Sequence, residues 1–120
     1  MPVSEDVRHW HATPKSAVGF LLHAGTMDLG TVGARRNLSM PGLSATVGEQ
    51  IAALERVAGK NVVSRIKRVP DQSIISIVNG WPRNFQTDRA LKLGFTTAEK
   101  TFDDIIRIHI EDELGGKFAA

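Results

Sequence analysis

The sequence predicts a small α+β domain in which several helices are connected by few short strands. Three observations support this fold class. The helical segments carry clear start and stop signals, the extended segments between them are short, and no run of βαβ units or internal repeat is present. A length of 120 residues suits one domain spanning residues 1–120, and 42% hydrophobic content can form a core.

The first strand and helix are predicted from the sequence VRHWHATPKS. Residues 7–12 are expected to form a strand that directly precedes a helix signal. Thr13 is a good N-cap, and Pro14 suits the first helical position, where no backbone N–H is needed. An apolar stripe follows from residue 17 to residue 24, and Gly25 is a plausible end. Residues 25–36 are rich in glycine and are expected to form a loop.

The middle of the chain contains the clearest local signal. Thr46 and Glu49 form a T-x-x-E capping box, and the apolar residues that follow have near-helical spacing up to Gly59. The sequence therefore predicts a helix over 46–58. Two further strands are expected, over 36–40 and within 62–69, and each is ended by a proline.

The last third of the chain is predicted to be mainly helical. Asp71 could cap a helix that ends at Asn79-Gly80, although eight residues alone do not distinguish helix from strand. A short helix is expected from residue 87 or 88 to Gly94. A final helix begins at Thr101 and ends at 115–116.

Composition excludes several classes of function. The chain has no cysteine, so it has no disulfide, thiol nucleophile or thiolate metal site. It has no tyrosine, so no tyrosine can act as an acid within it. No stretch approaches the length of a membrane span, and the N-terminus is too polar for a signal peptide. We therefore expect a cytoplasmic protein without membrane partners.

Charge is distributed unevenly along the chain. Residues 61–98 hold six Lys/Arg residues and two acids, whereas residues 99–120 hold three basic and six acidic residues. The basic 61–98 segment could form a small anion- or nucleic-acid-binding module, or merely solvated helix faces. The net charge of +2 and the acidic end make nucleic acid an unlikely partner.

Some candidate sites lack the residues that they need. His9 and His11 share a strand face, but no further metal ligand except Glu5 or Asp6 lies nearby, so no metal site is predicted. The LGTVGARRN segment (29–37) lacks the strand-then-helix setting of a phosphate loop.

A set of arginines and tryptophans near strand ends and turns is a better candidate. Arginine binds carboxylate or phosphate through two hydrogen bonds, and tryptophan can exclude water from such a site. The candidate pocket residues are Arg8, Trp10, Arg68, Asp71, Trp81 and Arg83.

These motifs resemble the C-terminal part of the extended short-chain dehydrogenase/reductase family, which includes NAD-dependent epimerases and dehydratases. Residues 7–24 are similar to the family's Arg-Asp-aromatic strand and its Ala-containing helix. KRVPD (67–71) resembles its Arg-x-x-Asp element, and TDRALKLGF (87–95) its closing segment. The runs WHATPKSAVGF and GWPRNFQTDRA are especially similar to the D-erythronate dehydrogenase branch.

The resemblance implies a substrate-binding domain that lies over an N-terminal Rossmann sheet. Arg8 and Trp10 would line the substrate cleft, Arg68 and Asp71 would hold the polar or anionic end of the substrate, and Trp81 and Arg83 would lie near it. The substrate would be a small sugar acid or a nucleotide-sugar. NAD is implied for the parent protein.

The chain also departs from the family pattern. His9 stands where an Asp is common, and Lys15 replaces a common Asp at the helix start. The dinucleotide loop and the Tyr-x-x-x-Lys pair are missing. We therefore expect no catalytic residue and no cofactor bound by this chain alone. Its expected partner is the Rossmann half, or a second copy that covers exposed apolar surface.

Overall fold

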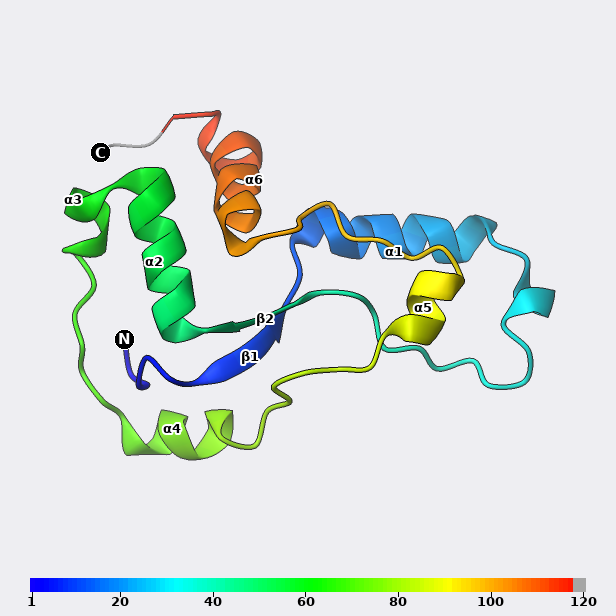
Figure 1. Ribbon diagram of the computed structural model, residues 1–120, viewed down its shortest axis with the longest axis horizontal. Helices are drawn as coiled ribbons and strands as arrows, with labels where there is room; N and C mark the ends of the chain where they lie inside the picture. The colour runs from blue at the N-terminus through cyan, green and yellow to red at the C-terminus, as the bar shows by residue number, and fades with distance from the viewer. Residues whose placement is uncertain (118–120) are drawn as a thin grey trace.

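The computed structural model describes residues 1–117 and confirms an α+β fold (Figure 1). Within that range, six α-helices accompany one two-stranded sheet and a short 3-10 turn at Leu29–Thr31. The elements are β1 (Arg8–His11), α1 (Pro14–Thr26), β2 (Leu43–Thr46), α2 (Val47–Ala58), α3 (Lys60–Val63), α4 (Gln72–Val78), α5 (Asp88–Lys92) and α6 (Phe102–Leu114).

The helix predictions are confirmed, and side-chain caps explain most of the starts. Thr13 accepts a hydrogen bond from Ser16 N, and Thr46 forms a complete capping box with Glu49. Asp71 accepts from the first backbone N–H groups of α4, and α6 starts with a second capping box. These caps satisfy donors that have no partner inside a helix, so local sequence is sufficient to place the starts.

Two of the three predicted strands are wrong in position or in kind. β1 pairs antiparallel with residues 43–46, not with 36–40, in a register that places Arg8 opposite Thr46 and His11 opposite Leu43. Within 62–69, the chain continues α3 and then runs irregularly. Apart from local turns, its backbone and that of Asp71 bond to the N-terminus, through Val69 N to Met1 O and Asp71 N to Pro2 O, both 3.0 Å, and through the Met1 amine to Lys67 O. A strand needs a partner strand with a continuous ladder of hydrogen bonds, and these isolated bonds do not form a ladder.

The sheet lies at the centre of a flat molecule. Figure 1 shows α2 and α6 above the strands, α4 below them, and α1 with α5 extending to one side. The radius of gyration is 16.8 Å and the extents are 51 × 36 × 18 Å. A compact domain of this length has a radius of gyration of about 14 Å. The chain is therefore thin and leaves much apolar surface without a protein neighbour.

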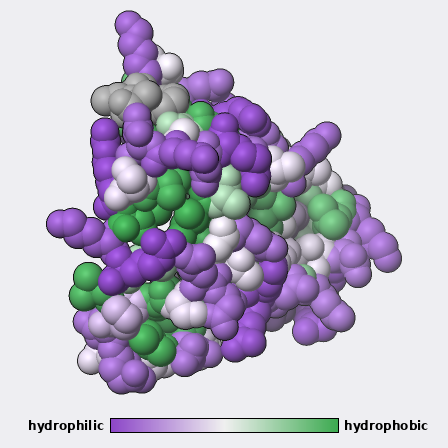
Figure 2. Space-filling model, turned by 60° about the vertical axis from the view of Figure 1, so that its left-hand side comes forward, coloured by the Kyte–Doolittle hydropathy of each residue, from purple (hydrophilic) through white to green (hydrophobic). Residues whose placement is uncertain are grey.

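The buried core is small and divided between two sites. At one site α2 packs against α6, and the Arg56 guanidinium binds both carboxylate oxygens of Asp103 at 3.1 and 2.6 Å. At the other, Phe95 is almost fully buried, and its ring meets the rings of Phe20 and His23 edge to face. Figure 2 shows apolar side chains reaching the surface between polar ones on the side that carries α2 and α3.

A buried carboxylate joins α1 to the segment before α6. Glu99 is fully buried and accepts hydrogen bonds from Thr13 N (2.9 Å), Thr13 Oγ1 (2.7 Å) and Ser16 Oγ (2.6 Å). Ser16 Oγ also accepts a hydrogen bond from Ala98 N at 2.8 Å. Burial works to raise the pKa of Glu99, but the hydrogen bonds from Ser16 and Thr13 outweigh it and hold the pKa below its usual value. The carboxylate therefore stays ionised inside the protein.

Candidate functional site

The segment 81–85 brings four of the six predicted site residues together on the strand pair. The indole of Trp81 lies edge-on to the His9 ring with ring centroids 5.4 Å apart, and Phe85 lies edge-on to Trp10 at 5.8 Å. Between these contacts, Ser44 Oγ donates a hydrogen bond to Arg83 O at 2.7 Å. Segment 81–85 thus lies against the strands that carry Arg8 and Trp10, although 73 residues separate Arg8 from Trp81 in the chain, and Arg8 and Arg83 line one hollow.

Trp10 is held by close backbone contacts. Its Nε1 donates a hydrogen bond to Met40 O at 3.2 Å. A Cβ atom on Gly42 would lie only 2.7 Å from this nitrogen and 2.5 Å from His11 O. Glycine at position 42 therefore allows the indole to lie against the start of β2.

Arg8 is neutralised by a carboxylate of the neighbouring helix. Its Nη2 lies 3.1 Å from Glu49 Oε1, and its Nη1 donates to Ser44 O at 2.9 Å. The hydrogen bond from Thr46 N and then that from Arg8 hold the pKa of Glu49 below its usual value. Glu49 therefore caps α2 and fixes Arg8 with the same carboxylate.

Arg68 and Asp71 lie at the other end of this region, near the N-terminus. The guanidinium of Arg68 binds the Glu5 carboxylate, with Nε 2.8 Å from Oε1. Asp71 Oδ1 accepts from Ser73 N at 2.9 Å and from Ile74 N at 3.2 Å as the cap of α4. The structure gives both side chains partners within the chain and does not bring them to the 81–85 segment.

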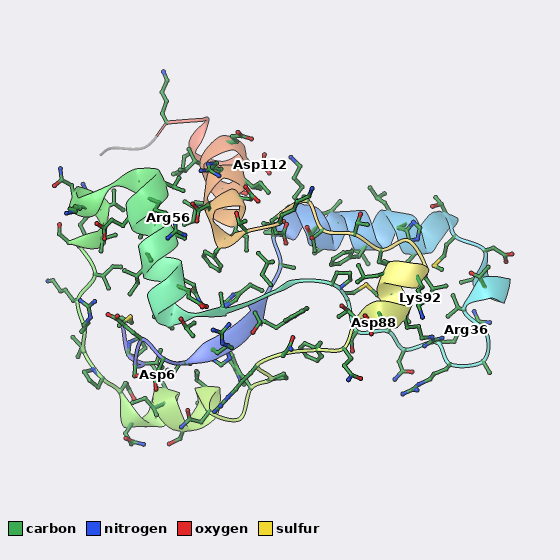
Figure 3. All side chains as sticks on the ribbon, viewed as in Figure 1. Asp6, Arg36, Arg56, Asp88, Lys92 and Asp112 are labelled. Carbon is green, nitrogen blue, oxygen red and sulfur yellow. The ribbon has the colours of Figure 1, made fainter. Side chains whose placement is uncertain are left out.

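A hollow of about 130 Å³ opens beside Arg83. It is lined by the start of β1, the end of α4 and the turn after it, namely Asp6, Val7, Arg8, His9, Val78, Asn79 and Arg83. Figure 3 shows Asp6 next to α4 at the beginning of the chain. None of the ion pairs within residues 1–117 involves Arg83. Besides the Asp6 carboxylate and Arg8, which Glu49 pairs, the lining of the hollow therefore contributes one arginine, Arg83, that is free to receive an anion.

The two strand histidines have different surroundings. His11 is half-buried, with Gln50 Nε2 3.1 Å from its Nε2, and burial together with His9 lowers its pKa. Both ring nitrogens of His9 are buried and have no hydrogen-bond partner in the described chain. No group of three or more metal-ligating side chains occurs among residues 1–117.

The basic 61–98 segment does not form one continuous charged face. Arg68 binds Glu5, and the guanidinium of Arg89 binds backbone oxygens of the loop 32–37, including Val32 O at 2.7 Å and Asn37 O at 3.2 Å. Figure 3 shows Asp88 and Lys92 on α5, near Arg36 and far from Asp6. The arrangement favours a local anion site over nucleic-acid binding. No helix within residues 1–117 is long and apolar enough to cross a bilayer.

Sequence reasoning missed three contributors to this site: Glu49, Ser44 and Asn79. Glu49 and Ser44 were explained by local caps and turns, and Asn79 by the end of α4. No local signal shows that residue 49 faces residue 8, because the strand register brings them together.

The chain matches parts of longer known proteins. No family model matches the chain. It is 36% identical over 111 residues to D-erythronate dehydrogenase of Cupriavidus necator, covering 92% of this chain and 34% of the relative. It is 32% identical over 113 residues to D-erythronate dehydrogenase of Haemophilus influenzae, covering 94% of this chain and 36% of that relative. The crystal structure of a nucleoside-diphosphate-sugar epimerase from Agrobacterium tumefaciens superposes with a TM-score of 0.94 and 57% sequence identity over 98% of this chain and 34% of that one.

Over more than nine-tenths of its length, the chain is similar to part of proteins of the extended short-chain dehydrogenase/epimerase family. The resemblance stated from sequence motifs is thereby confirmed, as is the α+β fold class. The chain spans about a third of the length of these relatives and corresponds to a C-terminal portion of such proteins. The names of these relatives describe two dehydrogenases and one epimerase.

Proposed function

We propose that this chain is the substrate-recognition portion of an NAD-dependent sugar-acid dehydrogenase. In this proposal the hollow beside β1 receives a small hydroxy acid whose carboxylate binds Arg83. The supporting observation is Arg83, which is one of the residues that line the hollow and forms no ion pair among residues 1–117. A guanidinium can bind a carboxylate through two parallel hydrogen bonds.

Charge and size favour a small acid over a nucleotide-sugar. A diphosphate carries about two negative charges and needs more than one cation, yet Glu49 neutralises Arg8 and Glu5 neutralises Arg68. The hollow of about 130 Å³ is also well below the 300–1,000 Å³ of typical pockets for larger ligands. One cation in a small hollow matches one carboxylate on a short carbon chain. Two relatives are named D-erythronate dehydrogenase, which fits this substrate class.

The described residues do not fit a dinucleotide. A dinucleotide site needs a glycine-rich turn between a parallel strand and a helix. The sheet in residues 1–117 is a single antiparallel pair, and β2 runs into α2 through a Thr-Val step. The proposal therefore assigns no hydride-transfer step to this chain, which supplies recognition and one wall of the cleft.

The apolar face of α1 is proposed to dock on the dinucleotide-binding half of the parent protein. Leu21 and Leu22 are 76% and 67% exposed, and Leu21 lines an apolar hollow of about 400 Å³ together with Phe20 and Met27. Exposed patches of this kind mark interaction surfaces, and the relatives are about three times as long as this chain. When the dinucleotide-binding half is absent, we expect this chain to self-associate.

Substituting these leucines tests the docking surface. The double variant Leu21→Lys, Leu22→Lys should shift the 120-residue chain toward monomer in light scattering, whereas Ile77→Lys on α4 should not. A monomeric wild-type chain at high concentration would contradict the expected self-association.

Substituting Arg83 tests the recognition site. The 120-residue chain is titrated with sodium D-erythronate at millimolar concentrations and followed by NMR. Arg83→Gln should weaken binding at least about tenfold, because hydrogen bonds to a charged group contribute about 1.5–3 kcal/mol. The matched control Arg107→Gln, on the exposed face of α6, should bind like the wild type.

Two results would contradict the proposal. One is unchanged erythronate binding by Arg83→Gln. The other is tighter binding of a nucleotide-sugar such as UDP-glucose than of the acid.

A further inference from the structure

His9 is the one side chain within residues 1–117 whose buried polar atoms lack any hydrogen-bond partner. The other histidines with described contacts are satisfied: His23 Nε2 lies 2.7 Å from Leu93 O, and His11 Nε2 lies 3.1 Å from Gln50 Nε2. Buried polar groups without partners are rare in folded proteins because their desolvation is not compensated. An unsatisfied imidazole in a candidate site therefore calls for a ligand group that satisfies it.

The position of His9 supplies the second observation. His9 is one of the residues that line the same hollow as Arg83 and Asn79. The Trp81 indole packs against the His9 ring in an edge-type contact, and Trp81 itself is 56% exposed. A half-exposed side chain on the turn after α4 can move away at lower cost than a buried one. Movement of Trp81 would uncover the His9 ring to a ligand.

The chemistry of the imidazole indicates what it would bind. A neutral imidazole has one N–H donor and one acceptor nitrogen, and a hydroxyl group likewise donates and accepts. An imidazole can therefore pair with a hydroxyl group of a bound acid as donor or as acceptor.

We propose that His9 is a specificity-determining residue of this hollow, which hydrogen-bonds a hydroxyl of the bound acid once the Trp81 indole has moved aside. This inference rests on the proposed function, because the carboxylate of the same acid is held by Arg83. In this inference His9 recognises a hydroxyl group of the acid, and Arg83 recognises its carboxylate.

The test compares two four-carbon acids that differ in their hydroxyl groups. Sodium D-erythronate and sodium butanoate are titrated into the 120-residue chain, and the imidazole ¹⁵N resonances are followed by NMR. The wild type should bind erythronate at least about tenfold more tightly than butanoate, and only erythronate should shift the His9 ring nitrogens. In His9→Phe the preference should disappear while butanoate binding stays unchanged. His9→Gln, which keeps a donor and an acceptor, should retain part of the preference.

Controls separate this inference from the proposed function. His109→Phe, on the exposed side of α6, should behave like the wild type. If His9→Phe does not fold, His9→Gln and the wild-type ring resonances decide the question. A full preference in His9→Phe, or ring nitrogens that do not respond at erythronate saturation, would overturn the role of His9. If in addition Arg83→Gln loses binding of both acids, the proposed function stands without the role of His9. A wild type that binds neither acid would overturn both.

Discussion

Two regions of the molecule bury polar side chains: the junction of Glu99 with Thr13 and Ser16, and the hollow beside His9 and Arg83. The buried polar atoms have hydrogen-bond partners at the junction and lack them at the hollow. At the junction, three donors from Thr13 and Ser16 surround one carboxylate. At the hollow, the ring nitrogens of His9 have no hydrogen-bond partner, and Arg83 forms no ion pair, among residues 1–117. Both regions begin on the same strand-to-helix segment, 8–16, only a few residues apart.

This difference separates residues that stabilise the fold from residues that are available to a ligand. A satisfied buried group contributes to stability and has no bonding capacity left, whereas an unsatisfied one costs stability until something binds it. The comparison predicts that variants at the junction lower the free energy of unfolding and leave ligand selectivity unchanged. Variants at the hollow should change ligand selectivity and should not lower the free energy of unfolding.

The largest expected effect is at Glu99. Glu99→Ala leaves Thr13 N, Thr13 Oγ1 and Ser16 Oγ without an acceptor, and each buried unsatisfied donor costs about 1–3 kcal/mol. We expect a loss of roughly 3 kcal/mol or more in the free energy of unfolding, measured by urea denaturation. Glu113→Ala, on the exposed end of α6, should change it by no more than about 0.5 kcal/mol. Equal stability of the two variants would show that the junction is not a stabilising element.

The pH dependence of stability is the next effect in size. The pKa of Glu99 is lower in the folded chain than its unfolded value of 4.5, so the unfolded state binds its proton first. Its contribution is therefore fully present above pH 4.5 and is lost as pH falls through the folded pKa. The variant Glu99→Gln lacks this contribution.

Unfolding curves of the wild type and Glu99→Gln from pH 7 to pH 3 measure the difference. The pKa of Asp103, Asp104 and Glu49 is also lowered, so acid destabilises both proteins. Because the pKa of His11 is lowered in the folded chain, both proteins also lose stability as the pH falls below 6.5. The difference between the two curves isolates Glu99 and should shrink only below pH 4.5. A difference that is independent of pH would contradict the ionised state of the buried carboxylate.

A smaller effect is expected at Asp71. Asp71→Ala removes the cap of α4 and should cost about 1 kcal/mol of stability, whereas Asp71→Asn should retain most of it because asparagine is also a good N-cap. Thermal unfolding of the two variants measures this. Reduced erythronate affinity in Asp71→Asn at unchanged stability would show that this carboxylate also contacts substrate, as the family resemblance implies.

The sequence predicted which types of residue form the candidate site, but it did not predict their partners. Arg8, Trp10, Trp81 and Arg83 are attractive from their chemistry, and segment 81–85 brings them together. Sequence could not show that Glu49 and Glu5 neutralise two of the arginines and leave Arg83 as the cation of the hollow. Nor could it show that His9, considered for a metal, is the unsatisfied group.

By itself, the sequence determined where the helices start and most of where they end. A capping oxygen such as that of Thr46 bonds an N–H three residues away, so the decisive interaction lies within one turn of chain. The tertiary structure alone decided which segment pairs with β1 and which arginine keeps its charge available. Strand pairing and ion pairing join residues 32 to 63 positions apart here, and such contacts depend on how the whole chain packs.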